Sequence, residues 1–485
     1  MRLSDLFGGG RDLAGQEQAP VTGFAIDSRK VATGTVFGAF RGMARNGEDF
    51  IPAAVAAGAV AVVARPEAIV EGAVHIADAA PRRTFAQAAG RFFAPFPRTV
   101  VAVTGTNGKT STVELTRQLW RMAGFHAASI GTLGVTTSNG EGADDSVSTG
   151  LTTPDIVTFL ANMGGLAREG VTHAAFEASS HGLSQFRAEG LPVQAAAFTN
   201  LSRDHLDYHG TMEAYLEAKL RLFTEVVAAD GTAVVWMDDE ASTRVAELAA
   251  ERGVRVLTVG TRGETLKLVA RAPSQLGQTL EIEAEGRRHT VKLPLIGAYQ
   301  AANALTAAGL VLAAGGRLEA VLADLARVQP VRGRLERAAI SKTGAPIYVD
   351  YAHTPDGLEA AIEALRPHTG KRLIALFGAG GERDRGKRPQ MGAVAMRLAD
   401  RVIVTDDNPR GEDAAAIRAE VLAGAPGAAE IGSRRDAIAA AIAEAGPDDI
   451  VLLAGKGHEQ GQIVGDRVLP FDDVQVAREC AGCAG

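Results

Sequence analysis

A glycine-containing loop is the part of the sequence whose residue types point most directly to chemistry. It reads Gly105-Thr106-Asn107-Gly108-Lys109-Thr110 and follows the β-branched run 99–104. Glycines let successive backbone N–H groups face phosphate oxygens, while Lys109 would add a point charge and Thr110 a hydroxyl ligand for Mg²⁺. Val103 replaces the first glycine of the strict phosphate-loop pattern, so a plain glycine turn before a helix is the alternative. Because Gly-Lys-Thr directly follows a strand-like run, we predict a site for the phosphates of ATP.

Two polar groups further along the chain could complete a magnesium site. Glu177 ends the strand-like run 172–177, and His205 lies in the polar stretch 199–209. Carboxylate oxygen suits Mg²⁺, and imidazole is a ligand in mixed sites. Taken alone, each residue could instead be a helix cap or a surface group. Since both follow apolar runs in the block that carries the phosphate loop, we interpret them as site residues.

The last third of the chain repeats one theme, an apolar run followed by a polar loop. The four loops begin at Asp350, Phe377, Thr405 and Ala454, and alanine-rich stretches separate them. This pattern predicts a doubly wound α/β sheet, in which ligands bind at the carboxyl ends of the strands. If the loops converge there, they form a mixed-charge cluster, although each member could also be a solvated loop charge. Its members are Arg383, Arg410, Lys456, His458 and Glu459.

One stretch of this region is similar to the motif of a dinucleotide-binding site. The stretch 377–383 resembles a dinucleotide fingerprint, but Arg383 occupies the place of its third glycine. We therefore do not expect a nicotinamide cofactor.

These motifs are distributed over three blocks. The proline-broken stretch 93–98 predicts a linker, a helix is expected over 112–124 after the phosphate loop, and the central block continues to about residue 327. We predict an α/β protein with an N-terminal domain (1–97), a central phosphate-loop ATPase domain with a mostly parallel sheet (98–327) and a C-terminal Rossmann-like domain (328–485). A length of 485 residues fits that number of domains.

The composition excludes several other classes of protein. With 46% hydrophobic and 22% charged residues, the chain is typical of soluble globular proteins. A net charge of −7 argues against a nucleic-acid partner. We see no signal peptide in residues 1–20, and the apolar run 53–64 is too short for a membrane span. Cys480 and Cys483 lack a second pair for zinc and suit a reducing compartment, so we expect a cytoplasmic protein.

Together the motifs resemble the Mur ligases over the whole chain. The phosphate loop of that family appears as 105–111, its donor-substrate signature as 152–154 and 177–187, and its uridine-nucleotide pattern as 27–42. The resemblance implies an ATP-dependent amide ligase of peptidoglycan synthesis. It would transfer the γ-phosphoryl of ATP to a glutamate carboxylate of UDP-N-acetylmuramoyl-L-alanyl-D-glutamate, and an amine would attack the acyl phosphate. We expect a monomer.

The same resemblance assigns roles to individual residues. From its neighbours in 215–223, Lys219 is expected to be an exposed helix lysine; the resemblance reverses this, because the family carries a carbamylated lysine (N6-carboxylysine) at that place. The implied catalytic residues are Lys109, Glu177, His205 and Lys219. The implied Mg²⁺ ligands are Thr110, Glu177, His205 and Lys219. The implied ATP contacts are Gly105, Thr106, Asn107, Gly108, Lys109, Thr110, Ser111 and, near adenine, Asn303. The implied donor contacts are Ile26, Ser28, Met43, Ala44, Arg45, Thr152, Thr153, Ser179, Gln185 and Arg187.

The last block predicts which amino acid is added. Asp407-Asn408-Pro409-Arg410 resembles the signature of family members that add meso-diaminopimelate, and lysine-adding relatives lack the arginine. Arg410 could bind the second carboxylate of diaminopimelate bidentately, whereas lysine would leave it unpaired. Glu459 would accept from the distal ammonium, with Gly455 and Arg383 completing the pocket. L-Lysine remains the alternative acceptor. A kinase or nucleotide switch with the same loop is the alternative of another class, although it leaves the last block unexplained.

Overall fold

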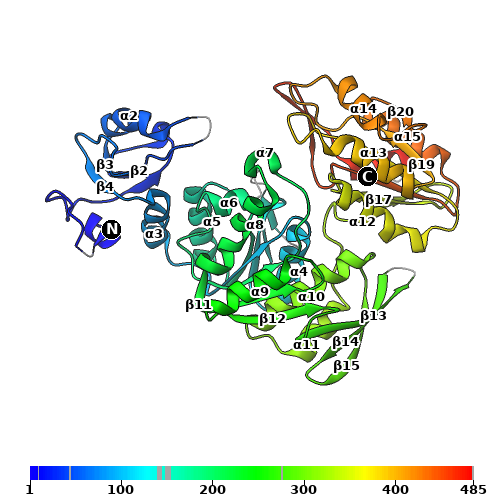
Figure 1. Ribbon diagram of the computed structural model, residues 1–485, viewed down its shortest axis with the longest axis horizontal. Helices are drawn as coiled ribbons and strands as arrows, with labels where there is room; N and C mark the ends of the chain where they lie inside the picture. Colours follow the sequence, from blue (N-terminus) through cyan, green and yellow to red (C-terminus); the bar gives the residue numbers. More distant parts are fainter. Residues whose placement is uncertain (9, 43–44, 139–144, 148–153, 275–276, 483–485) are drawn as a thin grey trace.

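In the described part of the chain, three sheets of four or more strands follow one another, each in its own lobe (Figure 1). The structure is a computed structural model that describes residues 1–8, 10–42, 45–138, 145–147, 154–274 and 277–482. The three-domain α/β class predicted from the sequence is confirmed.

Among the described residues, no helix is long and apolar enough to cross a membrane. Cys480 is a half-buried free thiol, and Cys483 lies outside the described residues.

The N-terminal lobe is a small parallel sheet with an aromatic core. Its strands are β1 (Gly23–Ala25), β2 (Thr35–Gly38), β3 (Ala59–Ala64) and β4 (Val74–Ala77), in that spatial order. Its helices are α1 (Leu3–Phe7), α2 (Ile51–Ala56) and α3 (Pro81–Phe93). Phe85 on α3 packs against Phe24 and Phe40 with ring centroids 5.2 and 5.4 Å apart. These contacts fix α3 on the sheet, and Figure 1 shows the same helix facing the central lobe.

The central lobe contains the largest sheet, whose middle is parallel. Its strand order is β15-β14-β13-β12-β11-β10-β5-β9-β6-β7-β8. The strands are β5 (Thr99–Thr104), β6 (Ala127–Gly131), β7 (Gly134–Ser138), β8 (Asp145–Val147), β9 (His173–Glu177), β10 (Val193–Phe198), β11 (Val227–Trp236), β12 (Arg255–Gly260), β13 (Leu266–Ser274), β14 (Gly277–Ala284) and β15 (Arg287–Leu293). The helices are α4 (Lys109–Met122), α5 (Ile156–Arg168), α6 (Ser180–Ser184), α7 (Leu206–His209), α8 (Met212–Arg221), α9 (Ser242–Glu251), α10 (Ala298–Ala313) and α11 (Leu318–Leu325), with a π-helical turn at Leu222–Val226.

Strand β5 explains why residues 100–103, just before the phosphate loop, are all apolar. Val100 and Ala102 belong to one core cluster, while Val101 and Val103 belong to the cluster on the other side of the sheet. A strand buried on both faces cannot alternate apolar and polar residues. Its central place between β9 and β10 brings the phosphate loop to the carboxyl edge of the sheet.

The C-terminal lobe is the doubly wound sheet that the repeated pattern predicts. Its strands are β16 (Glu336–Ile340), β17 (Pro346–Asp350), β18 (Leu373–Phe377), β19 (Arg401–Val404), β20 (Ala429–Glu430) and β21 (Ile450–Ala454), in the order β16-β17-β21-β18-β19-β20. Its helices are α12 (Pro355–Leu365), α13 (Lys387–Leu398), α14 (Ala414–Leu422), α15 (Arg434–Glu444) and α16 (Asp473–Ala481). A separate hairpin joins β22 (Gly461–Val464) to β23 (Arg467–Pro470). The four predicted polar loops follow β17, β18, β19 and β21.

A buried ion pair fastens the last helix to this lobe. Arg434, at the start of α15, donates to Asp473 at the start of α16, with 2.6 Å between Nη2 and Oδ2, and both side chains are fully buried. The same Nη2 donates to the carbonyl oxygen of Ala454 at 2.9 Å, at the end of β21.

We predict that Arg434→Met destabilises the C-terminal lobe by about 3–5 kcal/mol, because Asp473 would remain buried without its partner. Hydrogen exchange of the β21 amides measures the stability of this lobe separately from the other two. Arg435→Met is the matched control, since Arg435 pairs with Glu479 at 2.7 Å on the exposed face of the same helices. That pair should contribute about 0–1 kcal/mol. Equal effects of the two substitutions would contradict the prediction.

Candidate active site

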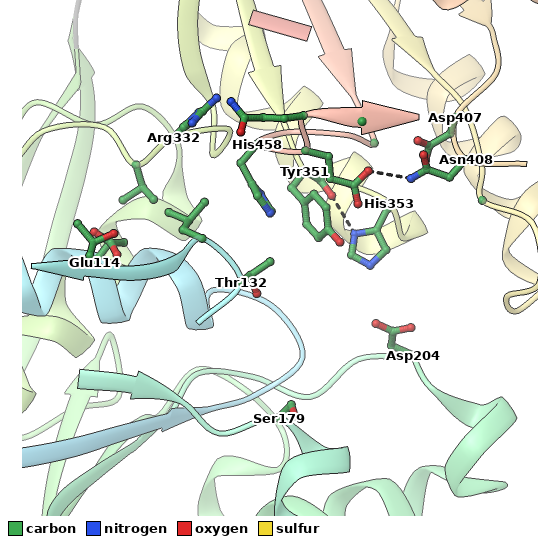
Figure 2. A pocket seen from close by; sticks show the side chains of 18 of the residues that line it. Glu114, Thr132, Ser179, Asp204, Arg332, Tyr351, His353, Asp407, Asn408 and His458 are labelled. Atoms are coloured by element: carbon green, nitrogen blue, oxygen red, sulfur yellow. Dashed lines mark hydrogen bonds between the residues drawn. The ribbon is translucent and has the colours of Figure 1, made fainter. Parts of the chain in front are cut away.

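A cavity of about 1600 Å³ lies between the central and C-terminal lobes. Thr132, Ser179, Asp204 and His205 line it from the central lobe. The C-terminal lobe contributes the loops after β17, β18, β19 and β21. Figure 2 shows Asp204 and Ser179 on one wall, with His353 and Asp407 on the opposite wall. Ligands held by different lobes could therefore meet in this space.

Hydrogen bonds through Glu177 connect the end of the phosphate loop to Thr132 on the cavity wall. Thr132 donates its backbone N–H to Glu177 Oε1 at 2.7 Å, and Thr110 Oγ1 donates to the same oxygen at 3.0 Å. Thr110 is in the first turn of α4, whose later residue Glu114 lines the cavity itself. Glu177 is only 2% exposed, so its carboxylate is held by defined donors rather than by solvent.

Both glycines of the loop are required by close contacts. Gly105 has φ +144°, and a Cβ there would lie 1.9 Å from Thr199 Oγ1. Gly108 has φ +85°, and a Cβ there would lie 2.3 Å from Asn303 Oδ1. The sequence predicted Asn303 near adenine; in the structure it is buried against Gly108. Its role toward ATP stays a prediction.

Two lysines converge on the carbonyl oxygen of Gly105. Lys109 Nζ donates to it at 3.0 Å and to the Thr106 carbonyl oxygen at 2.7 Å. Lys219 Nζ donates to the Gly105 oxygen at 2.7 Å and lies 4.1 Å from the ring centroid of Tyr215. Lys219 is 1% exposed, so the expectation of an exposed helix lysine is wrong. Burial and the nearby Lys109 charge hold the pKa of Lys219 well below its usual value.

His205 lies on the cavity wall immediately before α7. Its backbone has φ +53°, and its Nε2 is 3.5 Å from Asp204 Oδ2. Burial lowers the pKa of His205 to about 4, with Lys109 and Lys219 acting in the same direction, so its imidazole is neutral near pH 7. A neutral imidazole can accept a hydrogen bond or ligate a metal ion.

The oxygen donors suit Mg²⁺ only in part. Thr110 Oγ1 and Glu177 supply hard oxygen atoms 3.0 Å apart. In the part of the chain that the structure describes, no group of three His, Cys, Asp or Glu side chains is placed to hold a metal ion. A protonated Lys219 would repel a cation. A magnesium ion here therefore needs further anionic oxygens, which phosphates or a carbamate would provide.

Residues that the sequence did not single out connect the two lobes. Arg334, just before β16, donates from Nη2 to Thr110 Oγ1 at 2.9 Å, and its guanidinium lies 4.5 Å from the ring centroid of Tyr351. Lys387 and His353 line the cavity together with Asp204. Burial, with the Lys387 charge, lowers the pKa of His353 to about 4. Tyr351 and His353 could have been identified as cavity residues because they directly follow the apolar run that forms β17. Arg334 belongs to no motif that would have identified it.

The acceptor residues predicted from the last block come together. Arg383, Asp407, Asn408, Arg410, Gly455 and Glu459 line the cavity. Lys456, which is fully buried, donates to Asp407 Oδ1 at 3.3 Å, Asn408 Oδ1 at 3.0 Å and Glu459 Oε2 at 3.2 Å. Arg410 Nη1 donates to the Gly381 carbonyl oxygen at 2.8 Å. The loops converge as predicted, and which ligand they bind is a separate question.

The predicted donor residues fall into three groups. Ser179, Gln185 and Arg187 line the cavity, where Arg187 Nη2 donates to Gln185 Oε1 at 2.7 Å. Ile26 and Ser28 follow β1 in the N-terminal lobe, and Arg45 lies before α2; these three described residues do not line the cavity. The remaining four predicted contacts lie outside the described residues: Met43, Ala44, Thr152 and Thr153.

Comparison with known protein families matches most of the chain. Residues 20–100 match a model described as the Mur ligase family catalytic domain. Residues 103–311 match the Mur ligase middle domain, and residues 333–457 the Mur ligase glutamate ligase domain.

Individual relatives are similar over nearly their whole length. The UDP-N-acetylmuramoyl-L-alanyl-D-glutamate–2,6-diaminopimelate ligase of Zymomonas mobilis is 61% identical over 96% of this chain and 95% of its own. The ligase of the same name from Caulobacter vibrioides is 52% identical, covering 98% and 97%. A solved structure of a ligase with that name superposes with a TM-score of 0.72 at 34% identity, covering 99% of both chains. MurF of Thermotoga maritima in complex with ADP, at 21% identity and a TM-score of 0.62 over 95% of this chain and 97% of its own, shares the fold.

We predict that Gly108→Ala weakens ATP binding more than tenfold, which corresponds to about 1.4 kcal/mol. The new Cβ would displace either the loop or Asn303, because it would lie 2.3 Å from Asn303 Oδ1. Isothermal titration with a non-hydrolysable ATP analogue measures the change. Gly124→Ala is the control, since Gly124 has φ +86° but nothing within 4 Å of its added Cβ. The same affinity for both variants would show that the contact with Asn303 does not matter.

Proposed function

Because the chain belongs to the Mur ligase family, we propose that it is an ATP-dependent amide ligase that adds meso-2,6-diaminopimelate to UDP-N-acetylmuramoyl-L-alanyl-D-glutamate. ADP and phosphate are the other products, and the amide is a peptidoglycan precursor. The observation that carries this proposal is the convergence on one cavity of Thr132, which is bonded to Glu177 of the phosphate site, and the arginine-containing loop 407–410. The identity of 61% to a ligase of this name supports the same activity.

The chemistry fits a site that mainly positions reactants and compensates charge. A carboxylate is a poor electrophile, and phosphorylation by ATP gives it a leaving group. The loop 105–111 would bind the triphosphate with its N–H groups. Lys109, now bonded to loop carbonyl oxygens, would turn toward the phosphates and neutralise developing charge. Ser179, Gln185 and Arg187 would hold the dipeptide end of the donor, so that its carboxylate faces the γ-phosphate.

Magnesium is part of the proposal. Thr110 and Glu177 would be ligands together with phosphate oxygens, and neutral His205 is close enough to the cavity to contribute. The ion would neutralise the charge of the transferred phosphoryl group. Lys219 fits this role only as its carbamate. Its amine attacks the carbon of CO₂, one N–H proton leaves to solvent, and the resulting anion can ligate Mg²⁺.

Acceptor choice would depend on Arg410 and Glu459. In our proposal, Arg410 and Arg383 bind the second carboxylate of diaminopimelate, and Glu459 accepts from its distal ammonium. Asp407, Asn408, Pro409 and Gly455 would shape the pocket around that end. Buried polar groups that lysine leaves unpaired could reject it by a factor of ~10⁴.

Other features also remain proposals. We keep the domain boundaries 97/98 and 327/328, which fall between α3 and β5 and between α11 and β16. Ile26, Ser28 and the segment 43–45 would bind the uridine nucleotide in the N-terminal lobe, and Thr152 and Thr153 would contact the dipeptide. A monomer in the cytoplasm stays our expectation.

The acceptor prediction is tested by offering single amino acids with ATP, Mg²⁺ and the donor, and by detecting the amide product by mass. We expect turnover with meso-diaminopimelate, and Arg410→Ala should raise its KM roughly 10- to 100-fold, because a charged hydrogen bond contributes about 1.5–3 kcal/mol. Arg385→Ala, which removes a neighbouring arginine bonded to Glu412, is the control. Equal turnover with L-lysine would contradict the specificity. Phosphate release without any acceptor would favour a kinase or nucleotide switch.

The lysine modification predicts dependence on CO₂. Burial lowers the pKa of Lys219, so this amine loses its proton more readily than an exposed lysine does, and only the unprotonated amine reacts with CO₂. Enzyme prepared without bicarbonate should lose magnesium-dependent activity and regain it when bicarbonate is added, with a carbamate signal in ¹³C NMR after labelling. Lys219→Ala should lower kcat roughly 10²-fold or more and show neither recovery nor signal. Full activity in bicarbonate-free buffer without the signal would exclude the modification.

A further inference from the structure

An ionic and aromatic cluster joins the N-terminal lobe to the central lobe. We call it the Phe186 clamp, and its members are Arg83, Phe186, Glu189, Arg221 and Glu225. Two guanidinium groups from different lobes lie over the Phe186 ring. Arg221 is 3.9 Å from the ring centroid and Arg83, on α3, is 5.3 Å from it. Such stacking favours a fixed orientation of the ring.

The charges of the clamp alternate and compensate one another. Glu189 accepts from Arg83 Nε at 3.1 Å and from Arg221 Nη2 at 2.9 Å. Glu225 pairs with the same two arginines, at 2.8 Å from Arg221 Nη2. The Glu189 side chain is only 9% exposed, so water screens this ring of charges less than a surface pair. An ion-pair network of this kind stabilises an interface more than single exposed pairs do.

Next to the clamp, the backbone of α3 packs closely against the backbone of the central lobe. A Cβ on Gly90 of α3 would lie 2.3 Å from the Gly190 carbonyl oxygen, and one on Gly190 would lie 2.4 Å from the Ala86 carbonyl oxygen. Phe186 has φ +60°, a conformation that costs a residue with a side chain about 1–2 kcal/mol. The surrounding contacts must hold this strained residue in place.

Phe186 is flanked by two of the residues proposed to hold the dipeptide end of the donor. Gln185 and Arg187 line the cavity, and Gln185 Nε2 donates to the Tyr208 hydroxyl at 3.1 Å. The uridine end of the donor is proposed to bind the N-terminal lobe, which the clamp attaches through Arg83. The clamp therefore sets the distance between the two proposed half-sites.

We propose that the Phe186 clamp is a positioning device for the donor, which holds the nucleotide half-site and the dipeptide half-site at the spacing of one substrate molecule. This inference rests on the proposed function. Two linked half-sites bind a two-part ligand far more tightly than either part, provided that their geometry allows both to engage at once. Loosening the clamp should weaken the binding of the whole donor and leave the affinity for each separate part unchanged.

The test compares Arg83→Met with the wild-type enzyme. We expect the Kd and KM for UDP-N-acetylmuramoyl-L-alanyl-D-glutamate to rise about tenfold or more. The Kd values for UDP alone and for N-acetylmuramoyl-L-alanyl-D-glutamate, both measured by NMR titration, should not change. ATP affinity should also stay the same, and kcat at saturating donor should remain within about twofold, since the reacting groups are untouched.

Controls separate coupling from general destabilisation. Arg244→Met removes an exposed arginine that pairs with Glu213 and Glu217 inside the central lobe, and it should leave donor affinity unchanged. Arg83→Lys should restore part of the affinity. If Arg83→Met does not fold, Glu225→Gln, which neutralises a partly exposed member of the clamp, gives the same comparison.

Two results would overturn the inference. The first is an unchanged Kd for the whole donor in Arg83→Met. The second is an equal loss of affinity for the whole donor and for either fragment. A wild-type enzyme that does not bind or convert the donor would instead contradict the proposed function, so the two failures are distinguishable.

Discussion

The carbonyl oxygen of Gly105 accepts hydrogen bonds from two lysines, and the rest of the site depends on how these positive charges are compensated. Lys109 and Lys219 come from different helices, and among the described residues their hydrogen-bond acceptors are backbone carbonyl oxygens. Burial, together with the Lys109 charge, lowers the pKa of Lys219. In our proposal a triphosphate compensates the charge of Lys109, and carbamylation removes the charge of Lys219. The site is thus built for an anionic ligand before that ligand arrives.

The same logic explains why the site is shared between lobes. Arg334 belongs to the segment that leads into the C-terminal sheet, yet its guanidinium contacts Thr110 in the first turn of α4. Asp204 faces His353 and Lys387 across the cavity, and their charges lower the pKa of Asp204 despite its burial. Each lobe therefore supplies groups that compensate charges on the other. A ligase reaction needs this, because its phosphoryl donor and its amine must meet while water is excluded.

Parts of this architecture depend only on residues that are neighbours in the sequence, and those parts were predictable. The phosphate loop is contiguous, with a buried strand on one side and a helix on the other, so Gly105 and Lys109 could be identified without a fold. The acceptor loops were predictable because parallel strands place their carboxyl ends together, although β20, with only two residues, was too short to recognise. The burial of Lys219 was not predictable from its neighbours, since it depends on a carbonyl oxygen 114 residues away. Arg334 and the Phe186 clamp were missed for the same reason: their partners are distant in the chain.

In the acceptor pocket that we propose, specificity would come from charges that several residues supply together. Lys456 is buried between Asp407 and Glu459, so one positive charge faces two negative ones and an excess of one negative charge remains. That excess suits an ammonium group. Arg410 lies at the edge of the same cavity and its guanidinium is bonded to a neutral carbonyl oxygen, so its positive charge stays available for a carboxylate. Diaminopimelate carries both an ammonium group and a carboxylate at its distal end, so it can pair with the carboxylates and with Arg410 at the same time. Lysine offers the ammonium alone and would leave the half-buried guanidinium of Arg410 without an anion, which costs free energy.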